Sequence, residues 1–281
     1  MSTTQIEKSR DVATFKNRWF IRGTITTKSE LHIGDGGAGA IVDRSRLAKK
    51  YPQVEKDKEE SDASTVCTDY NGAAYIPSSG IKGPLRALVC DANGNLKQEW
   101  RDLFGSDKPD GDDACGGKLE FWDAFHAGGQ GEDSEQPNYD NHEAPDRKRP
   151  YWNNTRRTCV AVSVSLDRRT RTAKENLLYH VEYVPKGEKF QFEITGDNIE
   201  KDDACKFLDL LASLPQLGAE TSNGWGRVEV KLDSVHYLDA EGLENWKKKP
   251  VAFGSKDPLP DYFKTLDFSA TAAATSPDVL E

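Results

Sequence analysis

The chain has 281 residues, 36% of them hydrophobic, and a formal net charge of −9 at pH 7; this length can bury a substantial core in one elaborated domain or two small ones. No apolar run approaches a membrane span and the first residues lack the apolar stretch of a signal peptide, so we expect a cytoplasmic protein without a membrane partner. The five cysteines are odd in number and show no Cys-x-x-Cys spacing, which argues against a disulfide framework and a zinc site.

Hydrophobic periodicity predicts a mixed chain of strands and helices that begins with a strand over residues 19–33. Apolar residues at helical spacing predict helices over residues 84–92 and 202–214, the first starting at its proline and the second capped by Asp202 or Asp203. This order suits an antiparallel sheet backed by helices, and no internal repeat is visible. Strand patterns predict the later strands over residues 118–125, 158–166, 177–184, 189–195 and 226–232.

A glycine-rich loop is predicted directly after the first strand, over residues 34–44. Its glycines free the backbone to approach a nucleic acid strand, and the loop presents two carboxylates, Asp35 and Asp43. Each can instead be structural, because a loop aspartate often caps a turn or pairs with a nearby arginine.

The segment over residues 76–86 places hydroxyls, bare amides and cations at a predicted helix entrance. The N-terminal end of a helix carries unpaired N–H groups and the positive end of the helix dipole, a combination that holds phosphate. Ser78 and Ser79 offer hydroxyls, while Lys82 and Arg86, four residues apart, project from one face of the helix. The alternative is an ordinary helix cap with two solvated cations.

Positive charge is concentrated in one stretch of an otherwise acidic chain. Residues 145–174 contain nine Lys or Arg and two acids, a net charge of +7, which leaves −16 for the rest. Because affinity for RNA phosphates depends on Lys and Arg, this stretch is a candidate RNA-binding stripe, with an exposed stripe of no function as the alternative. Its candidate RNA contacts are Arg156, Arg157, Arg168, Arg169 and Arg171.

A second glycine-punctuated loop, over residues 218–227, precedes the last predicted strand. Such a loop can form a concave backbone surface for an anion. Gly224 opens the backbone, Arg227 supplies charge and Trp225 offers a face for stacking. A tight turn before an ordinary strand is the alternative.

Several short blocks occur in a fixed order along residues 18–230: Leu31-His32-Ile33-Gly34, Ala40-Ile41-Val42-Asp43, Tyr75 through Gly83, Leu103-Phe104-Gly105-Ser106, Gly117 through Phe125, and Gly218 through Val228. This order resembles the RAMP superfamily and, more narrowly, a backbone subunit of a type III CRISPR effector complex. Any one block is weak evidence, and the specificity lies in their order.

The resemblance implies an α+β, ferredoxin-like fold similar to an RNA recognition motif, in which an antiparallel sheet with helices carries large inserted lobes, including a thumb. We then expect a single RAMP domain over residues 1–256, with a charged insertion near residues 44–74 and an acidic lobe and thumb near residues 107–157. Residues 257–281 would form a flexible or partner-docking tail.

The resemblance also implies a function in antiviral defence. The chain would bind crRNA together with other RAMP-type and large subunits of the complex, and pairing with the guide would select the target RNA. Backbone subunits of this family cut target RNA with an aspartate of the first loop, aided by a divalent metal, Mg or Mn. By the match of its block, Asp43 is the catalytic candidate and Asp35 the second; we assign no residue as a metal ligand.

Two other functions stay open, so the sequence leaves open whether the chain is an enzyme. It can be a non-catalytic spacer or capping subunit that binds RNA in the same complex, or a free-standing RAMP endonuclease that processes CRISPR repeat RNA. The spacer would protect RNA without cutting it, whereas the free-standing endonuclease would cut precursor RNA as an isolated protein without metal.

Overall fold

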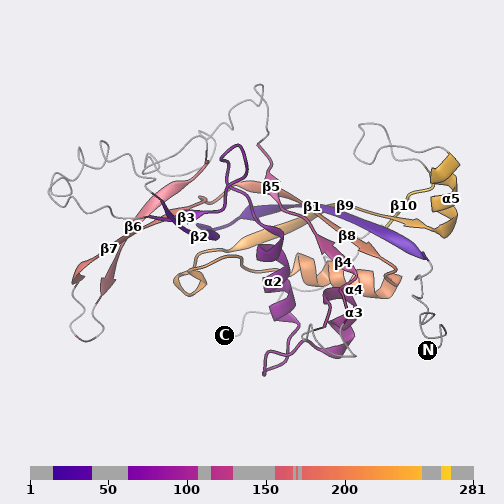
Figure 1. Cartoon of the computed structure of the whole chain (residues 1–281), viewed down its shortest axis with the longest axis horizontal. Coiled ribbons are helices and arrows are strands. Elements are labelled where there is room, and N and C mark those ends of the chain that lie inside the picture. The colour runs from indigo at the N-terminus through magenta and orange to yellow at the C-terminus, as the bar shows by residue number, and fades with distance from the viewer. Residues whose placement is uncertain are drawn as a thin grey trace, which may run out of the picture.

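The computed structural model describes residues 15–39, 63–106, 115–128, 156–166, 169, 173–248 and 261–266, which form two sheets and a small set of helices (Figure 1). The centre of the larger sheet is β1 (Asn17–Thr27), which pairs antiparallel with a strand on either side. The other strands of this sheet are β9 (Val228–Asp239), β8 (Lys189–Asp197), β4 (Leu119–Phe121), β5 (Phe125–His126) and β10 (Lys264–Thr265).

The order of strands in the larger sheet is that of a ferredoxin-like fold. It runs β10-β9-β1-β8-β4, with β5 also paired to β8. In the sequence, helix α2 (Ser78–Leu88) lies between β1 and β4, and helix α4 (Lys201–Ala212) lies between β8 and β9. This is a β-α-β-β-α-β arrangement with both helices on one side of the sheet, as Figure 1 shows, so the predicted fold class is confirmed.

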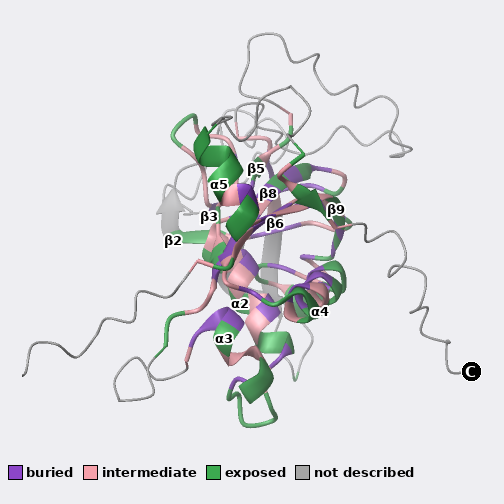
Figure 2. Cartoon of the chain, turned by 90° about the vertical axis from the view of Figure 1, so that its right-hand side faces the viewer, coloured by how far each residue is buried: buried purple, intermediate pink, exposed green. Residues whose placement is uncertain are grey.

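The core lies between the larger sheet and these two helices, where the buried positions gather (Figure 2). Alternation along β1 turns Trp19, Ile21 and Ile25 toward the helices, and all three are almost fully buried. Burial of this apolar surface is the main force that holds the helices to the sheet. The same cluster includes Phe190, Phe192 and Ile194 of β8, Ile81 and Leu85 of α2, and Phe207 and Leu211 of α4.

A second sheet contains β2 (Gly34–Gly39), β3 (Ala63–Val66), β7 (Ala173–Tyr183) and β6 (Cys159–Leu166), in that order. It lies at the opposite end of the molecule from β10 and α5 (Ala240–Lys248), with β6 and β7 outermost (Figure 1). Most pairs are antiparallel, but β3 and β7 run parallel. The strands predicted over 158–166 and 177–184 are therefore present, in a separate sheet from β1.

The start of α2 differs from the prediction, because the helix begins at Ser78 and runs through Pro84. A proline lacks the N–H of the helix ladder, and its ring clashes with the Cβ of the preceding residue. That residue is Gly83, which has no Cβ, so this clash is absent, and the helix continues past the proline with one hydrogen bond lost and the ring crowding the carbonyl of Gly80.

Three other local predictions need correction. Of the segment expected as a glycine-rich loop, residues 34–39 form strand β2, because their backbone pairs with β3, and residues 40–44 lie outside the described residues. The N-cap of helix α4 is Glu200, whose side chain makes no capping hydrogen bond. Asp202 and Asp203 lie in the first turn instead, where the positive end of the helix dipole stabilises their negative charge. The last predicted strand continues to Asp239 and leads into α5, a helix that was not predicted.

The remaining elements are short, and the expected insertions fall largely outside the described residues. They are η2 (Gln98–Trp100), α3 (Arg101–Phe104) and η4 (Thr221–Asn223). Residues 40–62, 107–114, 129–155 and 267–281 lie outside the described residues, so the charged insertion, most of the acidic lobe, the thumb and most of the tail stay predictions.

Candidate nucleic-acid interface

The entrance of α2 presents hydroxyls, but a carboxylate already binds its first amide. The Ser78 N–H donates to Oδ1 of Asp123 at 2.7 Å, so the segment after β4 caps the helix. Within the described part of the chain, the hydroxyls of Ser78 and Ser79 have no hydrogen-bond partner. The entrance can therefore offer these hydroxyls to a phosphate, while Asp123 offsets part of the positive potential of the helix end.

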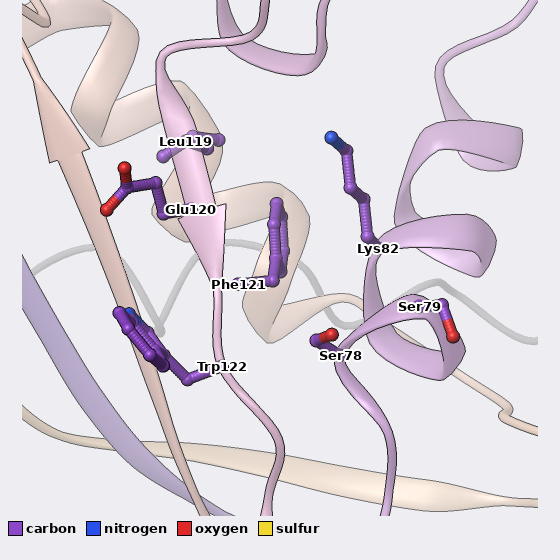
Figure 3. A pocket seen from close by; sticks show the side chains of 7 residues that line it. All are labelled: Ser78, Ser79, Lys82, Leu119, Glu120, Phe121 and Trp122. Atoms are coloured by element: carbon purple, nitrogen blue, oxygen red, sulfur yellow. The ribbon is translucent and has the colours of Figure 1, made fainter.

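Lys82 and Arg86 lie one turn apart on α2, and Lys82 reaches toward β4. Its ammonium lies 5.9 Å from the ring centre of Phe121. These residues line a hollow of about 590 Å³, and Figure 3 shows Phe121 of β4 beside Lys82 there, with Glu120 and Trp122 turned away from Lys82. Arg86 is in the last turn of α2. The hollow is lined by Ser78, Ser79, Lys82, Leu119, Glu120, Phe121 and Trp122.

The loop over residues 218–227 is anchored to the chain that leaves β1. The Ala219 N–H donates to the carbonyl of His32 at 2.8 Å, and the Gly226 N–H donates to the carbonyl of Glu30. Gly226 has φ 78°, and a Cβ there would lie 2.0 Å from the carbonyl oxygen of Leu217, so only glycine fits. The loop is a defined turn whose backbone is fixed by long-range bonds.

The α2 entrance and this loop meet on one side chain, Ile33. A methyl group on Gly80 would lie 3.7 Å from Cδ1 of Ile33, and one on Gly218 would lie 3.0 Å from its Cγ1. We call this meeting point the Ile33 junction: Ile33, the α2 entrance and the 218–227 loop. Two glycine-bearing segments that are far apart in the sequence are thus adjacent in space.

The predicted contact residues of the two segments point to different neighbours. Lys82 faces Phe121, whereas the ring of Trp225 lies 5.3 Å from that of Tyr183 in β7. Arg227 is exposed, and its guanidinium has no partner among the described residues. The junction therefore has two polar walls, one ending at β4 and the other at the second sheet.

Asp35, the second catalytic candidate, lies on β2, and the buried His32 lies just before this strand. Oδ1 of Asp35 accepts a hydrogen bond from the Thr65 hydroxyl at 2.6 Å. The ring of His32 has Nδ1 2.6 Å from the Glu182 carbonyl, so Nδ1 carries the proton, and Nε2 accepts from the Ser64 hydroxyl at 3.2 Å. This places His32 in a structural role that joins the end of β1 to the second sheet.

The carboxylates near this strand make the surroundings of Cys67 negative. Burial, followed by the charges of Asp35 and Asp123, raises the pKa of the Cys67 thiol. None of the five cysteines, all of which are described, forms a disulfide bond. Asp43 lies outside the described residues, and within those residues no group of three or more His, Cys, Asp or Glu could hold a metal ion.

Comparison with protein families matches the sequence model of the RAMP superfamily to residues 24–229. The chain belongs to the RAMP superfamily. The matched span runs from within β1 to the start of β9, so it includes α2, the whole second sheet and the 218–227 loop. RAMP proteins are generally CRISPR-associated, bind RNA and act with CRISPR RNA and other subunits of a complex. A search of curated protein sequences gave no significant match.

Two arginines of the basic stripe of this RAMP protein have structural partners. Arg156 donates from Nε to Glu182 at 2.7 Å and from a terminal nitrogen at 3.1 Å, and the Glu182 side chain is fully buried. Arg157 donates to the carbonyl of Gly128 at 2.8 Å. Arg169 is described, and Arg168 and Arg171 are not. Charge clustering in the sequence could not separate such paired arginines from unpaired ones.

The side of the larger sheet that faces away from the helices differs from that of an RNA recognition motif, which stacks bases on exposed aromatics. Here Arg18 donates to Asp197 and Arg22 to Glu193, which neutralises both cations. The ring of Phe263 lies 6.0 Å from that of Phe20, so the C-terminal segment covers part of this side. The Ile33 junction is therefore a better candidate for phosphate contact in this RAMP protein.

Sequence reasoning missed that side chains of β4 line the hollow opposite Lys82. The block from Gly117 through Phe125 contributed to the family resemblance through its position among the other blocks. Its apolar and polar residues do not alternate regularly, so the sequence did not predict which of its side chains are exposed. Trp122 is 56% exposed and Phe125 45%.

No described helix is both long enough and apolar enough to cross a membrane.

Proposed function

We propose that this RAMP protein is a crRNA-binding backbone subunit of a type III CRISPR effector complex and contributes metal-dependent cleavage of target RNA. The observation that carries the proposal is the Ile33 junction. It brings a helix entrance next to a glycine loop, and among the described residues the two serine hydroxyls of the entrance and the Arg227 guanidinium of the loop have no partner. Such groups contact phosphate and sugar without reading sequence, which suits a subunit whose guide selects the target by base pairing.

Contact with the RNA backbone would use both walls of the junction. Lys82 and Arg86 would neutralise phosphates along one face of α2, and Ser79 would donate its hydroxyl to a phosphate oxygen. Arg227 would approach from the loop. Because Asp123 occupies the first helix amide, side chains rather than the helix end alone would carry the affinity.

Cleavage would be performed by Asp43, with Asp35 as the second candidate. Asp43 would accept the proton of a ribose 2′-hydroxyl as that oxygen attacks the adjacent phosphorus. The bond from phosphorus to the 5′-oxygen of the next nucleotide breaks, and that oxygen takes a proton from water, which leaves a 2′,3′-cyclic phosphate and a 5′-hydroxyl. The described residues fit Mg or Mn only as an ion that RNA phosphates and water also coordinate, because they contain no cage of three ligands. When bound, the metal would neutralise charge on the phosphate.

The RNA-binding part is tested by Lys82→Ala with Arg86→Ala in the full chain. We expect weaker binding of a labelled crRNA in a salt titration, with a salt slope smaller by about 1.4, because each phosphate contact on a single strand contributes about 0.7. Lys206→Ala with Lys247→Ala is the control, since it removes the same charge from α4 and α5, where each lysine pairs with an acid. Equal binding by both double variants would refute the assignment.

The cleavage part is tested in the assembled complex with Mg²⁺ or Mn²⁺. We expect Asp43→Ala to bind guide and target normally but to lose one cut in the target RNA, seen as a missing product band on a gel. Asp35→Ala should retain that band. Normal products from the Asp43 variant with loss of the band from the Asp35 variant would move the catalytic role to Asp35, and normal products from both would leave a non-catalytic RNA-binding subunit as the function.

A further inference from the structure

A second hollow lies on the side of the larger sheet that faces away from the helices. Its volume is about 690 Å³, and residues of β1, β8 and β9 line its floor. Floor residues Arg22 and Glu193 alternate along their strands with the buried Ile21 and Ile194, which face the helices. We call this the outer hollow, because the sheet separates it from α2 and α4.

Aromatic side chains that follow β4 form one wall of the outer hollow. Trp122 and Phe125 both line it, and both are exposed. Figure 3 shows Trp122 turned away from Lys82, and its indole N–H lies 3.4 Å from the Thr195 hydroxyl. Phe125 stacks on Tyr75, with ring centres 5.9 Å apart, so the aromatic surface continues beyond the hollow. Exposed aromatics held in place in this way are typical of sites where a partner binds.

A β-bulge in β9 adds an acid to the side of the outer hollow that lies across from this wall. The pairing of β1 with β9 shifts by one residue between Arg22 and Gly23, which leaves Asp233 as the extra residue of β9. Asp233 is exposed, and its Oδ2 accepts a hydrogen bond from the Thr24 hydroxyl at 2.7 Å. Bulges re-aim side chains and are frequent beside functional sites. The bulge thus presents the Asp233 carboxylate to the hollow.

The outer hollow is negatively charged and rich in open acceptor atoms. Oε2 of Glu193 accepts from Nε of Arg22 at 2.7 Å, which neutralises that cation. Within the described part of the chain, Oε1 of Glu193 and Oδ1 of Asp233 have no hydrogen-bond partner. The charged residues of the described lining are Arg22, Asp123, Glu193 and Asp233, a net charge of −2. The hollow therefore repels a phosphate and attracts a cation.

We infer that the outer hollow docks an arginine-bearing segment of a partner protein. The Trp122 N–H donates to the Glu193 carbonyl at 3.1 Å, so these two residues are neighbours across the strands. A guanidinium stacked on Trp122 can donate to the Glu193 carboxylate, and Asp233 would hold a second basic residue. Arginine fits better than lysine, because its planar guanidinium both stacks on an aromatic face and donates to a carboxylate as a fork.

A protein segment fits this surface better than a free cation does, because the aromatic surface extends to Tyr75 outside the hollow. RNA fits it less well, because the acids repel its phosphates. The inference goes beyond the proposed function, since it concerns the side of the sheet away from α2 and needs no bound RNA.

The test uses the full chain without RNA and a labelled peptide of alternating Gly and Arg, followed by fluorescence anisotropy. We expect Trp122→Ala to weaken binding about 2- to 30-fold, the range for one cation–π contact. Asp233→Asn should weaken it by up to about 5-fold, the range for an exposed ion pair. Trp122→Phe keeps an aromatic face and should retain part of the affinity, and a peptide of alternating Gly and Lys should bind more weakly than the arginine peptide.

The matched controls remove the same residue types elsewhere on the surface. Trp246→Ala removes an exposed tryptophan of α5, and Asp209→Asn removes an exposed acid of α4. Both should bind the peptide like the unmodified protein. If Asp209→Asn weakened binding as much as Asp233→Asn did, or if Trp122→Ala had no effect, the peptide would be held by the acidic chain as a whole and the inference would be wrong.

A second measurement needs no folded alanine variant. The indole N–H signal of Trp122, assigned in an NMR spectrum as the one missing from Trp122→Phe, should shift as the arginine peptide is added to the unmodified protein. A signal that stays in place at saturation would put the peptide elsewhere. Binding of a labelled crRNA should be the same for Trp122→Ala and the unmodified protein. Loss of crRNA binding with peptide binding intact would make the outer hollow an RNA surface and overturn the inference.

Discussion

The Ile33 junction and the buried cluster around Glu182 are both built from polar and charged side chains, yet their groups are satisfied differently. Glu182 accepts from Arg156, from the Thr158 hydroxyl at 2.6 Å and from the Val66 N–H at 2.9 Å. At the junction, the α2 hydroxyls and the guanidinium of Arg227 have no partner among the described residues. A cation with a buried partner stabilises the fold, whereas one without a partner can serve a ligand.

The largest expected effect is on folding, from Glu182→Ala. The change leaves Arg156 and the Val66 amide without their acceptor inside the protein, and breaking a buried ion pair typically costs about 3–5 kcal/mol. Urea denaturation should show this loss in the free energy of unfolding. RNA affinity of the folded fraction should stay unchanged, because the cluster holds the second sheet rather than RNA.

Glu229→Ala is the control, since it removes an exposed glutamate that pairs with Lys28 on the surface. Exposed pairs of this kind contribute about 0–1 kcal/mol. If the two variants lost equal stability, or if Glu182→Ala selectively weakened RNA binding, the contrast between the two regions would be wrong.

A smaller effect is expected from Asp123→Ala, which removes the carboxylate that caps α2. Loss of a helix cap typically lowers stability by about 1 kcal/mol. RNA affinity should rise, because a negative charge leaves the proposed phosphate site and the Ser78 amide becomes available. Urea denaturation and anisotropy with a labelled crRNA measure the two changes.

Asp123→Asn separates the two contributions, because it keeps an oxygen that can accept from Ser78 and removes only the charge. Its stability should lie near that of the unmodified protein, and its RNA affinity should rise as for alanine. A fall in affinity for both variants would show that Asp123 itself supports RNA binding and would remove the α2 entrance as an anion site.

Local pattern predicted most of the elements and left their pairing open. Alternation along residues 19–27 and 189–195 is regular because one side of each strand is buried, so β1 and β8 could be predicted. The strands at 158–166 and 177–184 were predicted from the same kind of strand pattern, but that pattern does not indicate which sheet a strand joins. The start of α2 was misplaced because proline is typical of the first turn of a helix, whereas Pro84 lies in the interior of this one.

The sequence predicted which segments contribute to the candidate site, but not how they come together. The glycine loop and the serine-lysine segment were visible in the sequence, but their meeting at Ile33 depends on tertiary contacts. The role of Arg156 depends on Glu182, which is distant in sequence and buried by folding. Exposure of Trp122 depends on its place at the edge of the larger sheet, which no sequence period records.

The Ala219 to His32 hydrogen bond has a consequence for biosynthesis. Translation delivers the early part of a chain first, so the helix that begins at Ser78 leaves the ribosome well before the loop that faces it. Until that loop emerges, one wall of the junction is missing and its carbonyl partners are open to water. Guide loading by a nascent chain is thus disfavoured, and assembly with RNA would follow completed synthesis.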